Sequence, residues 1–68
     1  MNDYVITKNT IIKPKLAGSP LLELSTGSFY SLRRSDGWYL LTFQGKSYIV
    51  DKKQAHELLD RSELHTGD

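Results

Sequence analysis

Three runs of β-prone, largely apolar residues lie between residues 24 and 50, and two Gly-containing segments interrupt them. Such runs are typical of β-strands, in which successive side chains point to opposite faces. The interruptions, Asp36-Gly37 and Gln44-Gly45, are typical of hairpin turns because glycine adopts a positive φ at little cost. The pattern therefore predicts three antiparallel strands joined by two tight hairpins.

The middle strand of the three, predicted from Trp38 to Phe43, is apolar on both faces. Alternation places Tyr39, Leu41 and Phe43 on one face, and it places Trp38 and Leu40 on the other. A strand with two apolar faces is expected to lie between two other strands. We therefore expect the first set to enter the core, whereas the second set must be covered by a docked element, a partner or a groove.

The residues that precede this meander predict shorter elements. Residues 4–7 and 10–13 are β-branched runs, which predict either one bent strand or a tight pair of strands. Pro14 and Pro20 bracket the next segment, and neither proline can donate a hydrogen bond to a sheet. We expect this segment to be a surface loop or a sheet edge.

A helix is predicted after the last strand, because the apolar period changes to about 3.6 residues at Asp51. Asp51 and Gln54 form a capping pair at its start. The helix has two to three turns, and no Pro or Gly interrupts residues 52–64. Residues 65–68 are predicted to be a frayed tail, so that one domain spans residues 1–64.

The apolar stripe of this helix consists of Ala55, Leu58 and Leu59. It is expected either to cover an open end or an edge of the sheet, or to pair with the same helix of a second copy. The chain is thus predicted to be a monomer or a homodimer.

Composition excludes several classes of protein. The chain has 68 residues and no cysteine, which excludes disulfides and thiolate zinc sites. It shows neither a signal segment nor an apolar run of about 18 residues, so we expect a soluble, cytoplasmic protein without a membrane partner. The net charge of +1 indicates no particular class of partner, although the first 46 residues are mildly basic and the remainder mildly acidic.

Catalytic and metal-binding patterns are weak. The chain has no cysteine nucleophile, and it contains no phosphate-cradling glycine loop. His56 and Asp60 lie four residues apart and share a helix face, but only His65 offers a second imidazole. We interpret this face as solvated, and we predict no catalytic residue, no metal and no cofactor.

Several short motifs between residues 13 and 50 occur in a characteristic order along the chain. They are Leu24 and Gly27, then Gly37-Trp38-Tyr39-Leu40-Leu41, then Gly45-Lys46 and Ile49-Val50. In this order the stretch resembles the bacterial SH3 family of small β-barrels, whose central motif is Gly-Trp-Tyr-x-Val. The resemblance implies a mainly β fold, namely a small SH3-like five-stranded barrel with a short C-terminal α-helix. It also implies peptide or peptidoglycan binding, with Trp38 at the position of the groove tryptophan.

A binding module is the function that these observations favour. We predict a non-enzymatic, protein-binding chain, of the kind found as small bacterial or phage regulators or inhibitors, that occludes or recruits a larger protein. Trp38, Tyr30, Tyr48 and Arg34 are the predicted contact residues. The alternative for Trp38 is simple packing under a loop or the helix.

Nucleic-acid binding is the second hypothesis. A basic face next to the aromatic residues would contact phosphates and stack on bases of single-stranded or duplex nucleic acid. Its predicted members are Lys13, Lys15, Arg33, Arg34 and Lys46.

Overall fold

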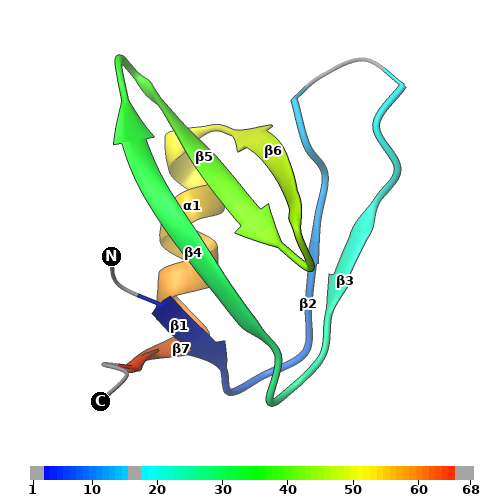
Figure 1. Cartoon of the computed structure of the whole chain (residues 1–68), viewed down its shortest axis with the longest axis vertical. Coiled ribbons are helices and arrows are strands. Elements are labelled where there is room, and N and C mark those ends of the chain that lie inside the picture. Colours follow the sequence, from blue (N-terminus) through cyan, green and yellow to red (C-terminus); the bar gives the residue numbers. More distant parts are fainter. Residues whose placement is uncertain (1–2, 16–17, 66–68) are drawn as a thin grey trace.

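The computed structural model describes residues 3–15 and 18–65, and it is mainly β with one short helix (Figure 1). The elements are β1 (Asp3–Ile6), β2 (Thr10–Ile12), β3 (Leu22–Leu24), β4 (Phe29–Ser35), β5 (Trp38–Phe43), β6 (Lys46–Val50), α1 (Lys52–Asp60) and β7 (Ser62–His65).

The strands form two antiparallel sheets. The larger sheet has five strands in the order β6-β5-β4-β1-β7, and β2 and β3 form a separate two-stranded sheet. The closed five-stranded barrel that the sequence predicted is not formed by the described residues, because β6 and β7 are the two edges of an open sheet. Lys15 N donates a 2.9 Å hydrogen bond to Ile49 O, so the segment after β2 runs beside the β6 edge without completing a closed ladder.

Both predicted hairpins are confirmed. Ser35 pairs with Trp38 and Phe43 pairs with Lys46, which leaves two-residue turns between the strands. Gly37 has a φ of 79° and Gly45 a φ of 76°, the positive values for which glycine is suited. The three-stranded meander β4-β5-β6 therefore follows directly from local turn chemistry.

The core lies between the meander, the β2-β3 hairpin and α1. Leu41 is fully buried, Phe43 is buried and Tyr39 packs against them, so the predicted core face of β5 is confirmed. Among the described residues, ten apolar side chains make up the buried cluster: Ile6, Ile12, Leu22, Leu24, Tyr30, Leu41, Phe43, Val50, Ala55 and Leu58. Because every element except β7 contributes to this list, the two sheets and the helix share one core.

The two N-terminal runs form neither one bent strand nor a pair with each other. β1 pairs with β4 and β7, whereas β2 pairs with β3. The turn between β1 and β2 is hydrogen-bonded to the segment that precedes β4, because Asn9 Oδ1 accepts a 2.8 Å hydrogen bond from Thr26 N. Ile6 in turn bonds Gly27 and Ser28 through its backbone. These contacts from residues 26–28 direct β1 and β2 into different sheets.

The helix begins as predicted, and its nine residues agree with the predicted two to three turns. Asp51 Oδ1 accepts a 2.8 Å hydrogen bond from Gln54 N, which confirms the N-cap. Ala55 and Leu58 are fully buried in the core, whereas Leu59 is half-buried, so two of the three stripe residues pack within the chain. The helix ends at Asp60, because Thr7 N donates to the carbonyl of Arg61 and draws the chain into β7.

The C-terminal residues of the described chain are thus a strand that the sequence did not predict. His65, which was expected in a frayed tail, pairs with Asp3 as the last residue of β7. The rest of the predicted tail, residues 66–68, lies outside the described residues, as do residues 16–17 of the predicted loop.

Candidate functional site

The outer face of the meander carries an apolar cluster centred on Trp38. Arg33 on β4, Leu40 on β5 and Ile49 on β6 lie opposite one another in one row of the sheet. Trp38 precedes Leu40 by two residues, so its side chain projects from the same face. We call Trp38, Leu40 and Ile49 the Trp38 face.

The Trp38 face is uncovered by the helix. Leu41 and the buried helix residues belong to the same core cluster, so α1 packs on the face of the sheet opposite to Trp38. Figure 1 is viewed from the uncovered side, and α1 lies behind β4 and β5. Trp38 and Ile49 are each 36% exposed, and Leu40 is half-buried. Packing of Trp38 under the helix, one of the two sequence-based alternatives, is therefore excluded by the position of α1.

Positive charge flanks this apolar face. Arg33 is exposed on the β4 side. On the β6 side the backbone hydrogen bond to Ile49 places Lys15 at the sheet edge, where Lys15 Nζ lies 3.9 Å from Asp51 Oδ2. This ion pair is solvent-exposed and contributes little to stability.

A polar row separates the Trp38 face from a second apolar area on the same side of the sheet. Ser31, Thr42 and Ser47 lie opposite one another across β4, β5 and β6, and the hydroxyls of Thr42 and Ser47 are 3.3 Å apart. Beyond this row, Phe29 packs edge-on against His65 with ring centroids 5.0 Å apart. The outer face thus carries two separate apolar areas.

The four predicted contact residues do not form one surface. Tyr30 is only 2% exposed and belongs to the core, where its hydroxyl donates a 2.7 Å hydrogen bond to Ser62 Oγ. Tyr48 is half-buried and packs against the same core. Arg34 is exposed but lies opposite Tyr39, on the other face of the sheet from Trp38. Of the predicted set, Trp38 alone lies on the uncovered face, because the other three have the opposite strand parity.

The five predicted basic residues are also dispersed. Arg33 and Arg34 are neighbours in β4, so their side chains leave opposite faces of the sheet. Lys46 lies opposite Phe43, at the other end of β5 from Trp38. Lys13 and Lys15 are exposed beyond the end of β2. The structure therefore groups Arg33 and Lys15 around the Trp38 face and separates the others from it.

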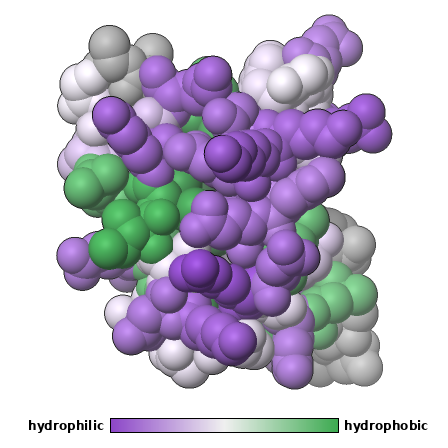
Figure 2. Space-filling model, turned by 180° about the vertical axis from the view of Figure 1, so that it is seen from behind, coloured by the Kyte–Doolittle hydropathy of each residue, from purple (hydrophilic) through white to green (hydrophobic). Residues whose placement is uncertain are grey.

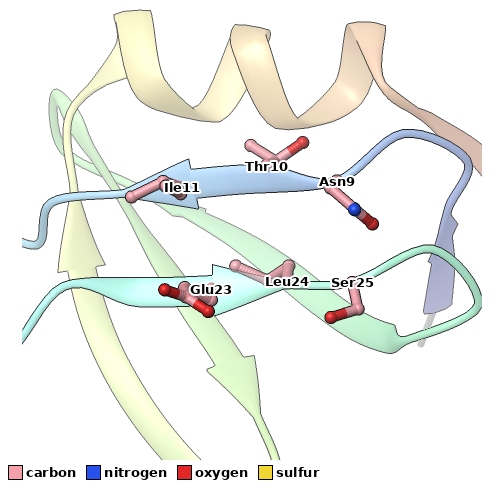
Figure 3. A pocket seen from close by; sticks show the side chains of 6 residues that line it. All are labelled: Asn9, Thr10, Ile11, Glu23, Leu24 and Ser25. Atoms are coloured by element: carbon pink, nitrogen blue, oxygen red, sulfur yellow. The ribbon is translucent and has the colours of Figure 1, made fainter.

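A depression on the β2-β3 hairpin was not predicted from the sequence (Figure 3). Its volume is about 270 Å³, and it is lined by Asn9, Thr10, Ile11, Glu23, Leu24 and Ser25. Thr10 is buried and its hydroxyl donates a 2.8 Å hydrogen bond to Lys8 O, while Asn9 Oδ1 accepts from Thr26. The Thr10 hydroxyl and the Asn9 side-chain oxygen are thus hydrogen-bonded within the chain. Only the alternation of β2 and β3, which exposes Ile11 opposite Glu23, could have indicated this surface.

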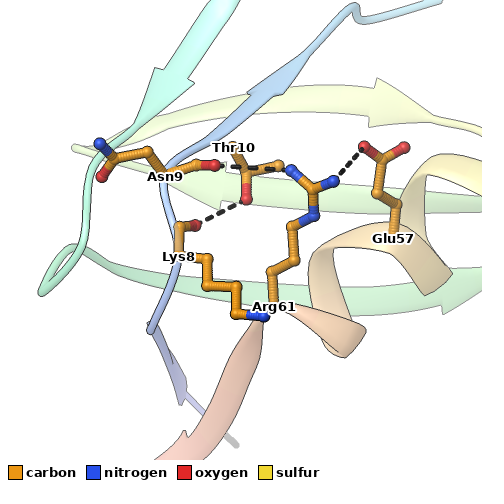
Figure 4. Close-up of polar contacts among 5 residues, drawn as sticks. All are labelled: Lys8, Asn9, Thr10, Glu57 and Arg61. Carbon is orange, nitrogen blue, oxygen red and sulfur yellow. Dashed lines mark hydrogen bonds and ion pairs between the residues drawn. The ribbon is translucent and has the colours of Figure 1, made fainter.

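Arg61 connects the depression to the end of the helix (Figure 4). Its guanidinium donates to Asn9 O at 3.5 Å and lies 3.9 Å from Glu57 Oε1. Its backbone carbonyl accepts hydrogen bonds from the amide and the hydroxyl of Thr7. This network attaches the loop after β1 to the last turn of α1, which is a structural role.

Titratable side chains do not gather into a reactive centre within residues 3–15 and 18–65. His56 is exposed on α1, and no group of three or more His, Asp or Glu side chains there is arranged to hold a metal ion. Burial raises the pKa of the Tyr30 hydroxyl above its usual value of 10.0. The raised pKa of Tyr30 therefore reflects the position of its ring in the core.

The chain was compared with known proteins, and no family model, curated protein or solved structure matches it.

In the part of the chain that the structure describes, α1 is too short and too polar to cross a membrane. The hydrophilic surface on the α1 side is visible in Figure 2, where the larger hydrophobic areas lie at the two sides of the view. The Trp38 face is therefore the feature from which a function can be inferred.

Proposed function

We propose that this protein is a non-enzymatic binding module whose Trp38 face contacts a larger protein. The exposure of Trp38 on an uncovered sheet face is the observation that carries this proposal. Tryptophan is enriched among the residues that dominate binding energy, because its large ring excludes water from a partner's pocket. Leu40 and Ile49 lie beside it and would extend the apolar contact.

The charge around the Trp38 face indicates the chemistry of the partner. Arg33 lies on one side of the Trp38 face, whereas Lys15 on the other side is paired with Asp51 at 3.9 Å. A partner with an apolar pocket next to an acidic group that contacts Arg33 would therefore be complementary. The three residues of the Trp38 face are fewer than the 20 to 30 per side of a typical stable interface, namely about 800 Å² per partner. We therefore expect neighbouring polar residues such as Ser35 and Thr42 to form the rim.

The proposed fold family is the SH3-like family, here with an open sheet in place of a closed barrel. The proposed role is that of a small bacterial or phage regulator that occludes or recruits its partner. The motif residues around Gly37 and Gly45 support this fold, since both glycines form the expected hairpin turns. The backbone hydrogen bond between Lys15 and Ile49 also supports it, because it brings the segment after β2 to the edge of β6.

A protein partner is favoured over nucleic acid. Nucleic-acid binding requires a continuous basic surface, whereas Arg34 and Lys46 lie away from the pair formed by Arg33 and Lys15. Chromatography on heparin and on immobilised oligonucleotides tests this choice. Salt-dependent retention that decreases in an Arg33→Ala, Arg34→Ala double variant would favour nucleic acid instead.

The proposal is tested by comparing two exposed aromatic residues on the same sheet. A partner captured from the source cell is purified, and its affinity is measured for the wild type, Trp38→Ala and Phe29→Ala. We expect Trp38→Ala to weaken binding by about 30-fold, the equivalent of about 2 kcal/mol. Phe29→Ala, which removes a side chain that is 54% exposed at the other end of the sheet, should leave the affinity within about twofold.

The melting temperature separates binding from folding in the same experiment. Trp38 is 36% exposed, whereas Leu41 is fully buried, so Trp38→Ala should lower the melting temperature less than Leu41→Ala. Unchanged partner affinity in Trp38→Ala, together with a fall in melting temperature as large as that of Leu41→Ala, would contradict the proposal.

A further inference from the structure

Only one side of the β7 backbone is hydrogen-bonded, and the direction of the hydrogen bonds along the neighbouring strand β1 shows which side it is. Ile6 N donates to Ser28 O at 2.9 Å and Ile6 O accepts from Gly27 N, so Ile6 directs its polar groups towards the β4 side. Thr7 N donates to Arg61 O, towards the β7 side. Since these directions alternate along an antiparallel strand, Val5 and Asp3 also bond β7.

The same alternation assigns the backbone groups of β7. Glu63 lies opposite Val5 and His65 lies opposite Asp3, so both direct their backbone groups to β1. Ser62 and Leu64 must then direct theirs outward. β7 is the last strand of its sheet, and within residues 3–15 and 18–65 no other strand pairs with it. The outward N–H and C=O of Leu64 are thus available to another strand.

The side chains of this edge are self-complementary. When two copies of β7 pair antiparallel about a two-fold axis at Leu64, each Leu64 lies opposite the other. Glu63 then lies opposite His65 of the second copy, where imidazole N–H groups can donate to the carboxylate. A two-fold axis at Glu63 would instead place two carboxylates opposite each other, which is unfavourable. Charge therefore selects the first register.

The exposure of Leu64 favours pairing at this edge. Leu64 is 56% exposed, and the proposed register would bury part of it against its symmetry mate. His65 packs edge-on against Phe29 of β4, two strands inward from the edge, with ring centroids 5.0 Å apart. Its imidazole must therefore turn outward from Phe29 to meet Glu63 of the second copy.

We propose that β7 pairs with β7 of a second copy of this chain, in the register centred on Leu64, and joins two five-stranded sheets. The contact is isologous and therefore closes as a dimer. It goes beyond the proposed function, because the Trp38 face lies on β4 to β6 and remains free in such a dimer.

Sedimentation velocity of the full chain, from micromolar to millimolar concentration, tests the proposal with a matched pair of variants. Leu64→Pro removes the outward N–H but no bond to β1, a position where a sheet edge accepts proline. We expect it to weaken dimerisation by about tenfold or more, since each dimer loses two hydrogen bonds. Leu64→Ala keeps the donor and should dimerise more strongly than Leu64→Pro.

A charge exchange keeps the proposal testable if Leu64→Pro does not fold. Glu63→Lys alone and His65→Glu alone should each dimerise more weakly than the wild type. Mixing the two variants places the introduced lysine opposite the introduced glutamate and keeps His65 of one copy opposite Glu63 of the other, so a heterodimer should form. A wild type that stays monomeric at millimolar concentration, or a mixture that associates no better than its components, would overturn the proposal. Neither result would bear on partner binding by Trp38, which is measured separately.

Discussion

The hydroxyl of Tyr30 donates a 2.7 Å hydrogen bond to Oγ of Ser62, a residue that is 32 positions away along the chain. Oγ of Ser62 in turn donates to the carbonyl of Leu58 at 2.5 Å. This chain of hydrogen bonds joins β4, β7 and the end of α1. Ser62 thereby satisfies the buried Tyr30 hydroxyl, and it gives the Leu58 carbonyl a second donor beside the Arg61 amide.

Tyr30→Phe should lower the free energy of unfolding by about 1 kcal/mol, the typical net contribution of one hydrogen bond. Urea denaturation measures this change, and an unchanged m-value would show that the folded state retains its compactness. The control is a double-mutant cycle with Ser62→Ala. Additive losses in the double variant would show that the two hydroxyls do not act together.

The stability of the protein should also depend on Tyr30 at alkaline pH. Burial raises the pKa of the Tyr30 hydroxyl above 10.0, the hydrogen bond to Ser62 lowers it, and the nearby Tyr4 raises it. The folded state therefore holds this proton more tightly than the unfolded state does. The corresponding stability is present below pH 10 and is lost as the pH rises through the pKa of the folded state.

Denaturation of the wild type and Tyr30→Phe at several pH values measures this dependence. The difference in unfolding free energy between them should decrease above pH 10, because the variant lacks the titrating group. The other tyrosines are common to both proteins and cancel in this difference. Parallel stability curves through this range would argue against a buried Tyr30.

The N-cap of α1 provides a third prediction. Asp51→Ala should destabilise the protein by about 1 kcal/mol, because Gln54 N loses its acceptor. Lys15→Ala removes only the exposed 3.9 Å ion pair to the same carboxylate and should change stability by less than about 0.5 kcal/mol. Thermal unfolding followed by circular dichroism compares the two variants. Equal losses would assign the role of Asp51 to the ion pair.

The turn between β5 and β6 provides a fourth prediction. Gln44 has a φ of 52°, a conformation in which asparagine is several-fold more frequent than most residues. Gln44→Asn should therefore stabilise the hairpin by on the order of 0.5 kcal/mol, since it creates the preferred Asn-Gly turn. The opposite control is Gly45→Ala, in which the added methyl meets no atom within 4 Å. Its expected cost of about 1 kcal/mol therefore reflects the positive φ alone. Calorimetry that shows no rise in melting temperature for Gln44→Asn would contradict the assigned turn.

Part of the candidate site could be predicted from the sequence. Strand parity alone separates Trp38 from Leu41, and the register confirms that they lie on opposite faces of β5. Parity alone could not separate Trp38 on β5 from Tyr30 and Arg34 on β4, because positions on two strands can be assigned to the same or opposite faces only when the register between the strands is known.

The sequence by itself determined the β4-β5-β6 meander, its two turns and the cap at Asp51, because each depends on residues that are neighbours along the chain. Only the tertiary structure decided that residues 62–65 form a strand, that β1 and β2 enter different sheets and that the sheet remains open. Those features depend on hydrogen bonds between distant segments, such as Thr7 with Arg61 and Tyr30 with Ser62. The β-propensity of a segment as short as β7 is too weak to form a strand without a partner, and pairing with β1 stabilises it.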